Sequence, residues 1–261
     1  GAKEAQTQPL FWAEILLGSL ALLLFALFPY NTFGDDLRMM KENAMPFITV
    51  LGLLLAVWSA SVSIAEELEG RTALTLLSKP VTRRQFILGK FVGVLGPVYV
   101  LCLVLGTVFL LCIAFRLSYE SIEMTRRAAT AEQCRAEMLH IIPGLVLIFF
   151  EATVLSSISV AISTRLPMIP NLVICAAIYA LGHLVPLFVQ SSVGRLPIVT
   201  FVGQFLATIL PVLDHFNIQA AVAAGRSVPL EYLAWAGCYA VLYSSVAMLL
   251  ALILFEDRDL A

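Results

Sequence analysis

Long stretches without a charged residue constrain this chain most. Such runs occupy residues 15–34, 44–65, 91–115, 166–194 and 232–255, and each reaches the length of about 20 residues that an α-helix needs to cross a bilayer. Overall, 60% of the residues are hydrophobic and 13% are charged, whereas soluble domains are roughly half apolar and about a quarter charged. The sequence therefore predicts an all-α, polytopic membrane protein.

A further apolar run, 138–164, is interrupted only by Glu151, so we count it as a sixth span that carries a buried acid. The first two spans are joined by a polar loop, NTFGDDLRMMKENAMP, before the second span begins at Ala44. One transmembrane domain then covers residues 1–261. The predicted spans are approximately 11–33, 44–65, 88–115, 138–163, 169–190 and 232–255.

The segment 191–230 precedes the last span and contains a shorter uncharged run, 196–213, that is broken by Pro197, Gly203 and Pro211. Irregular backbone is tolerated at membrane depth only where it is buried in protein or lines a cavity. We therefore predict an external, re-entrant or interfacial hairpin here. The alternative is a seventh crossing, which would put the two termini on opposite sides.

The charged segment 66–90 between the second and third spans has the pattern of two helices joined by an elbow. Pro80 disfavours helix at Lys79, while Thr82 and Gln85 have the spacing of a capping box and predict a new helix start at Thr82. Arg83 and Arg84 then fall in a first turn, where the helix dipole disfavours cations. Lipid phosphate or an acidic groove on a partner protein would compensate them.

Other classes of function are excluded or unsupported. A net charge of −2 gives no basic surface for nucleic acid, and the five cysteines form no C-x-x-C pair, so we expect neither a disulfide nor a metal site. The chain contains no phosphate-binding G-x-x-x-x-G-K-[ST] loop, no H-E-x-x-H and no G-x-S-x-G. We expect no catalytic residues and no nucleotide bound to this chain.

Two ionisable residues inside predicted spans, Glu151 and His183, define a candidate intramembrane polar site, because such groups are costly to bury and are often functional. A simpler interpretation is a protonated Glu151 bonded to the hydroxyl of Thr153 or Ser156. The small-residue stripe along that span, Ala152, Ser156, Ser159 and Ser163, predicts helix packing, with a polar substrate path as the alternative.

The segment ELEGRTALTLLSKPVTRRQFILGK resembles the permease subunits of type-2 ATP-binding-cassette exporters. In that family a span ends in an acidic E-x-x-x-G-[RT] stretch, which is followed by S-x-P-[VI]-[ST]-R and then L-G-K. The matching residues are Glu66, Gly70, Arg71, Leu76, Leu77, Ser78, Pro80, Val81, Thr82, Arg83, Leu88, Gly89 and Lys90. The segment PVLDHFN at 211–217 is also similar to the family's pattern, whereas the amphipathic helix that usually precedes the first span is matched only by a polar stub.

The resemblance implies that this segment couples the permease to a separate ATPase subunit, which would bind ATP and magnesium in place of this chain. Lysine and arginine divide evenly between the two sides, with higher density in 66–90; the resemblance implies that 66–90 and both termini are cytoplasmic, in a cell membrane such as the bacterial inner membrane. It also implies a second permease copy, as a homodimer or pseudo-dimer surrounded by lipid. The implied docking residues are Glu66, Glu67, Glu69, Gly70, Arg71, Ser78, Pro80, Thr82, Arg83, Arg84, Gly89 and Lys90.

Two other functions fit the residues. The chain could be a polytopic membrane enzyme that uses Glu151 and His183, or a membrane scaffold that recruits a cytosolic partner without transport. The three hypotheses can be separated by whether an ATPase associates with the chain, because only the exporter needs one.

Overall fold

A computed structural model describes residues 9–28, 36–69, 82–123, 131–190, 201, 203, 205 and 208–256, and these residues form helices and turns without a strand. The predicted all-α class is confirmed. The elements in chain order are α2 (Pro9–Leu27), α3 (Asp36–Glu69), α5 (Arg83–Glu123), α6 (Ala131–Ser163), α7 (Met168–Gln190), the 3₁₀ helix η2 (Leu213–Phe216), α9 (Gln219–Ala223) and α10 (Leu230–Glu256).

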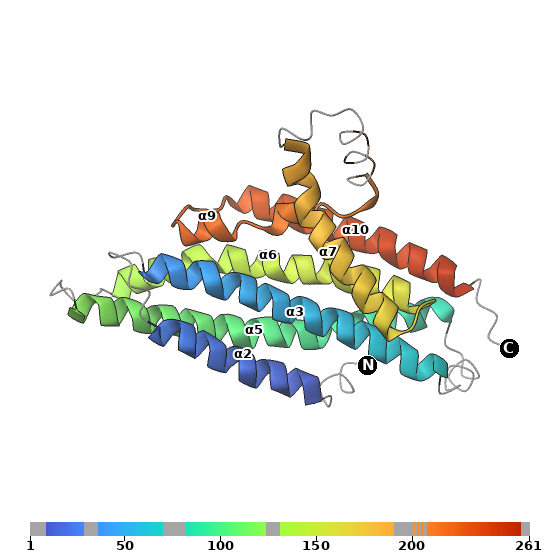
Figure 1. Cartoon of the computed structure of the whole chain (residues 1–261), viewed down its shortest axis with the longest axis horizontal. Coiled ribbons are helices and arrows are strands. Elements are labelled where there is room, and N and C mark those ends of the chain that lie inside the picture. The colour runs from blue at the N-terminus through green and yellow to red at the C-terminus, as the bar shows by residue number, and fades with distance from the viewer. Residues whose placement is uncertain are drawn as a thin grey trace.

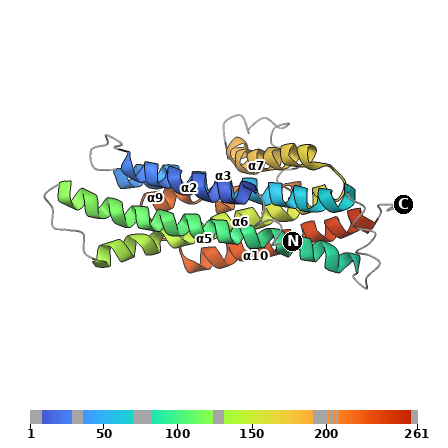
Figure 2. The same cartoon turned by 90° about the horizontal axis from the view of Figure 1, so that it is seen from below.

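Five of these helices, α2, α3, α5, α6 and α10, are long and apolar enough to cross a membrane. They run side by side along the long axis of the molecule (Figures 1 and 2). The predicted span 169–190 corresponds to α7 (Met168–Gln190), whose apolar part Met168–Leu184 is shorter. In Figure 1, α7 is inclined to the bundle and its C-terminal end points away from it.

The helices extend beyond the predicted apolar spans at the end of the bundle where α2 finishes. Helix α3 begins at Asp36 and continues through Pro46, so the predicted polar loop is wrong for the residues between Asp36 and Ala44. Arg38 and Glu42 form an ion pair one helical turn apart with 2.8 Å between Nε and Oε1, a spacing that stabilises a helix. Hydropathy identifies only the part of a helix that meets lipid. Ion pairs such as this one stabilise the helix where it extends into water.

Ion pairs between helices lie at this same end. Arg116 of α5 is buried, donates to a carboxylate oxygen of Asp36 on α3, and also reaches the backbone carbonyl of Ala26 on α2. The buried Lys41 of α3 lies 2.6 Å from Oε2 of Glu137 on α6. Removing one partner of a buried pair leaves an uncompensated charge, so these contacts fix α2, α3, α5 and α6 to one another here.

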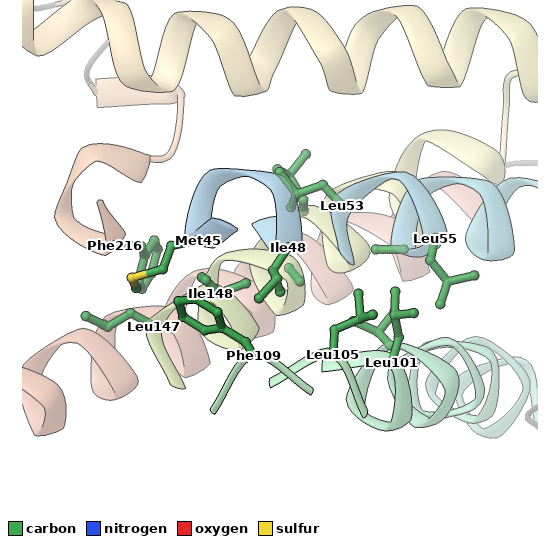
Figure 3. Close-up of a cluster of buried hydrophobic side chains, with 14 of the residues drawn as sticks. Met45, Ile48, Leu53, Leu55, Leu101, Leu105, Phe109, Leu147, Ile148 and Phe216 are labelled. Carbon is green, nitrogen blue, oxygen red and sulfur yellow. The ribbon is translucent and has the colours of Figure 1, made fainter. Parts of the chain in front are cut away.

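The apolar core lies between α3, α5 and α6 and reaches the 3₁₀ helix η2 (Figure 3). The labelled side chains of that core are Met45, Ile48, Leu53, Leu55, Leu101, Leu105, Phe109, Leu147, Ile148 and Phe216. Gly144 of α6 admits the closest approach, because a Cβ atom there would lie 2.3 Å from Cε of Met45. Small residues allow helices in membranes to pack closely in this way.

A buried cluster of neutral polar groups attaches the first turns of α7 to the bundle. The Asn171 side-chain nitrogen donates at 2.7–2.8 Å to hydroxyl oxygens from two other helices, those of Ser61 on α3 and of Ser159 and Ser163 on α6. Cys175 in turn donates to Oδ1 of Asn171. The serine stripe predicted to pack helices therefore does so, and it also supplies acceptors for one asparagine.

We predict that Asn171→Leu lowers the free energy of unfolding by about 1–3 kcal/mol, because one shared donor to several buried hydroxyls is lost. Denaturant titration in detergent micelles measures this change. Ser245→Ala is the matched control, since the exposed Ser245 donates only to Val241 of its own helix. Equal effects of the two substitutions would show that the cluster contributes nothing beyond helix packing.

Candidate functional site

The charged hairpin predicted between the second and third spans lies at one end of the bundle, where α3 ends and α5 begins. Figure 1 shows that α2 starts, α6 ends, α7 starts and α10 ends at this same end. Glu66, Glu67 and Glu69 belong to the last turns of α3. The elbow, with the predicted residues Gly70, Arg71, Ser78 and Pro80, lies outside the described residues.

The predicted capping box at the start of α5 is confirmed. The backbone N–H of Gln85 donates to Oγ1 of Thr82 at 3.3 Å, and the backbone N–H of Thr82 donates to Oε1 of Gln85 at 3.1 Å. Both bonds use donors that a helix start otherwise leaves without partners. The helix that begins at Arg83 then continues without a break through Pro97 to Glu123.

Lys90 joins the two helices of the hairpin. Its side chain is 6% exposed, its Nζ donates to the backbone carbonyl of Ser63 on α3 at 2.9 Å, and it lies over the ring of Phe86. A lysine placed in this way is unavailable to a docking partner. Its role at the hairpin is to connect α5 to α3.

A second apolar cluster lies beneath the hairpin and is separate from the central core. It combines Ala60 of α3, Ile87 and Val94 of α5, Val160 of α6 and Phe255 of α10. The rings of Phe86 and Phe255 stack with their centroids 5.6 Å apart. The first turns of α5 therefore rest on three other helices.

The opposite face of these first turns is open. Thr82, Arg84, Gln85 and Gly89 are exposed, and Leu88 is 47% exposed. Arg84 lies in the first turn of α5, which contains no acidic residue, so the helix dipole acts against its charge. Arg84, Gln85 and Leu88 therefore form an exposed face at the start of α5.

The two ionisable residues predicted within spans meet one another. Oε1 of the buried Glu151 on α6 lies 3.3 Å from Nε2 of His183 on α7. The hydroxyls of Thr153 and Ser156 donate to backbone carbonyls of α6, and a bond from a protonated Glu151 to such a hydroxyl stays a prediction. Only the packing of α7 on α6 reveals that Glu151 faces a histidine one helix away.

Sequence reasoning missed a set of tyrosines on α10 that hold the irregular segment before it. Tyr243 donates to the carbonyl of Ile209, Tyr239 accepts from the backbone N–H of Val212, and Tyr232 donates to the carbonyl of His215, at 3.0, 2.9 and 2.6 Å. Spacings of seven and four residues put all three on one helix face. That spacing, opposite a segment interrupted by proline, was the available signal.

Helices of this length and apolarity define a multi-pass membrane protein. The chain belongs to the ABC-2 family of transporter proteins, whose family model matches residues 13–260. It is accordingly a membrane permease of an ABC-type transport system, a class that works with an ATPase partner. No curated protein matches the chain. Among the described residues, no group of three or more His, Cys, Asp or Glu side chains is placed to hold a metal ion.

We predict that Thr82→Ala costs about 1 kcal/mol at the start of α5. The amides of the first turn should then exchange with solvent about fivefold faster. Hydrogen exchange followed by mass spectrometry measures this. Thr107→Ala is the control within the same helix, because the Thr107 hydroxyl donates to the carbonyl of Leu103; faster exchange near Arg83 in that variant would contradict the assignment to the cap.

We further predict that Tyr239→Phe lowers the free energy of unfolding by about 1 kcal/mol, because it leaves the Val212 N–H without its acceptor. Protease cleavage between Ile209 and Phe216 should increase in parallel. Tyr99→Phe, at an exposed tyrosine of α5, is the control. Unchanged cleavage in Tyr239→Phe would show that α10 does not hold this segment.

Proposed function

We propose that this permease is the membrane-spanning subunit of an exporter, and that the segment 66–90 docks a separate ATPase subunit that binds ATP and magnesium. The observation that carries the proposal is the attachment of the hairpin. A capped helix starts at the exposed Arg84 face and continues into the membrane, while Lys90 joins it to α3. A force applied to the hairpin is therefore passed to both helices together.

The length of α5 makes it suited to carry such a force. Its 41 residues extend over about 60 Å at 1.5 Å per residue. At the far end, Arg116 and Lys41 fix α5, α3 and α6 through their ion pairs. Movement of the hairpin by closure of the ATPase pair would tilt α3 and α5 about this fixed end.

The charge of the open face supports an acidic partner. Arg83 and Arg84 begin α5 without an acidic residue in the first turn, so a carboxylate groove on the ATPase would compensate both the side chains and the helix dipole. Glu66, Glu67 and Glu69 end the other helix of the hairpin and offer the opposite charge. Because the hairpin carries positive charges on one helix and negative charges on the other, a partner with complementary charges would dock in one orientation.

The remaining parts of the proposal concern topology and assembly. If α7 also crosses the membrane, the chain has six spans, and the hairpin and both ends of the chain lie on one side. We assign this side to the cytoplasm of a bacterial inner membrane. Figure 1 supports this grouping, since the described ends of α2 and α10 lie beside the hairpin end of the bundle. Two permease chains and two ATPase subunits would form the complete transporter.

We predict that Arg83→Glu combined with Arg84→Glu abolishes co-purification of the ATPase and ATP-dependent export, because the two positive charges at the start of α5 are reversed. The measurement is pull-down from membranes followed by transport in proteoliposomes. The permease itself should still fold and insert, since Arg84 is exposed.

Two single variants serve as matched controls. Arg165→Glu reverses an exposed charge in the turn between α6 and α7 at the same end of the bundle, and Arg226→Glu reverses one after α9 at the opposite end. Docking requires that both retain the ATPase. Loss of the ATPase in Arg165→Glu as well would indicate that these arginines bind lipid phosphate. Retention of the ATPase in the double variant would overturn the proposed docking.

A further inference from the structure

Glu151 on α6 and His183 on α7 are the only ionisable pair that joins these two helices among the described ion pairs. Glu151 is 1% exposed, whereas the His183 side chain is 20% exposed. The contact lies inside the predicted spans, where a charged group without a partner is costly.

The hydrogen bonds of His183 fix which of its nitrogens carries a proton. Nδ1 lies 3.1 Å from the backbone carbonyl of Tyr179, and a carbonyl oxygen only accepts, so Nδ1 carries a hydrogen. In neutral histidine Nε2 then carries a lone pair and no hydrogen. Oε1 of Glu151 is buried without a hydrogen-bond partner, and as a carboxylate it presents only lone pairs to Nε2 at 3.3 Å. The two groups therefore attract one another only when the pair holds a proton.

We propose that Glu151 and His183 form an intramembrane proton-binding site, and that the bound proton holds α7 against α6. The proton resides on the Glu151 carboxyl facing neutral His183, or on Nε2 facing the carboxylate. In both forms the pair has no net charge. Loss of the proton leaves a carboxylate facing a lone pair, and the contact becomes repulsive.

The proton controls one of two polar attachments of α7. The other is the Asn171 cluster, which consists of neutral hydrogen bonds and does not titrate. Release at His183 would therefore loosen α7 from Cys175 onward, while Asn171 in its first turn stays attached. This inference goes beyond the proposed function, because it requires neither the ATPase nor the hairpin.

Neighbouring titratable groups come from two further elements. Gly182 packs against Pro211 and Leu213, since a Cβ atom there would lie 2.9 Å from the Pro211 carbonyl and from Leu213. This places η2, with Asp214 and His215, beside α7. Val212 in turn bonds Tyr239 of α10.

Among the other elements packed against α6 or α7, α9 has no titratable side chain, and the buried cations Lys41 of α3 and Arg116 of α5 are in ion pairs. Tyr179 of α7 itself stacks beside the imidazole with centroids 4.7 Å apart. Asp214 is thus the carboxylate whose contribution must be separated from that of Glu151.

Cys175 supplies the measurement, because it is 1% exposed and lies two turns before His183. Cys112, 3% exposed between α5 and α2, is an internal reference away from α7. The full chain in lipid nanodiscs is treated with N-ethylmaleimide from mildly acidic to alkaline pH. Mass spectrometry of the peptides then gives the ratio of labelling at Cys175 to labelling at Cys112.

We expect this ratio to rise about fivefold at alkaline pH in the wild-type chain. Glu151→Gln should abolish the rise, because the amide N–H donates to Nε2 at every pH and replaces the shared proton. Glu151→Leu should give the high ratio throughout. Asp214→Asn should retain the wild-type response. In each variant, unchanged labelling of Cys112 shows that the bundle is folded.

Three results would overturn the proposal. A wild-type ratio that does not change with pH would show that no proton controls α7. A high ratio in Glu151→Gln, equal to that in Glu151→Leu, would show that the amide cannot replace the proton. Loss of the pH response in Asp214→Asn would assign the titration to η2. None of these measurements depends on ATP, so failure here leaves the proposed docking untouched.

Discussion

Every backbone N–H and C=O group within a bilayer must find a partner inside the protein, because lipid tails offer none. The long helices meet this requirement by themselves. Backbone groups at the helix ends and in the segment around η2 lack such partners within a helix. Polar side chains are found at those places. Thr82 and Gln85 complete the start of α5, Lys90 takes up the Ser63 carbonyl, and tyrosines of α10 take up groups of the segment around η2. Polar residues in this chain are best understood by which backbone group or which charge they satisfy.

The kind of polar contact changes along the bundle. Ion pairs lie at the end where α3 begins, and neutral hydrogen bonds surround Asn171, where α7 joins the bundle. In the pairs between helices the cation is buried and the acid stays partly exposed at the helix end, whereas a buried asparagine needs only hydroxyls and carbonyls. Glu151 and His183 depart from this pattern, since they place ionisable groups within predicted spans. A departure from an otherwise consistent arrangement is expected at functional positions more than elsewhere.

Local features of the fold were predictable from the sequence, and contacts between distant helices were not. Apolar runs indicated the spanning helices, and the spacing of Thr82 and Gln85 indicated the start of α5. The start of α3 was misplaced because hydropathy does not register the ion pairs that extend a helix beyond lipid. Lys90 could not be assigned to Ser63, nor Glu151 to His183, because each pairing depends on how two helices face one another. Periodicity within one helix carries no information on that relation.

The tyrosines of α10 also bear on the order in which the chain is built. The segment around η2 is synthesised before α10, yet groups of its irregular backbone find their partners on Tyr232, Tyr239 and Tyr243. Until the last helix has packed beside it, these backbone groups lack their tyrosine partners. Its final position is therefore a late event in biogenesis.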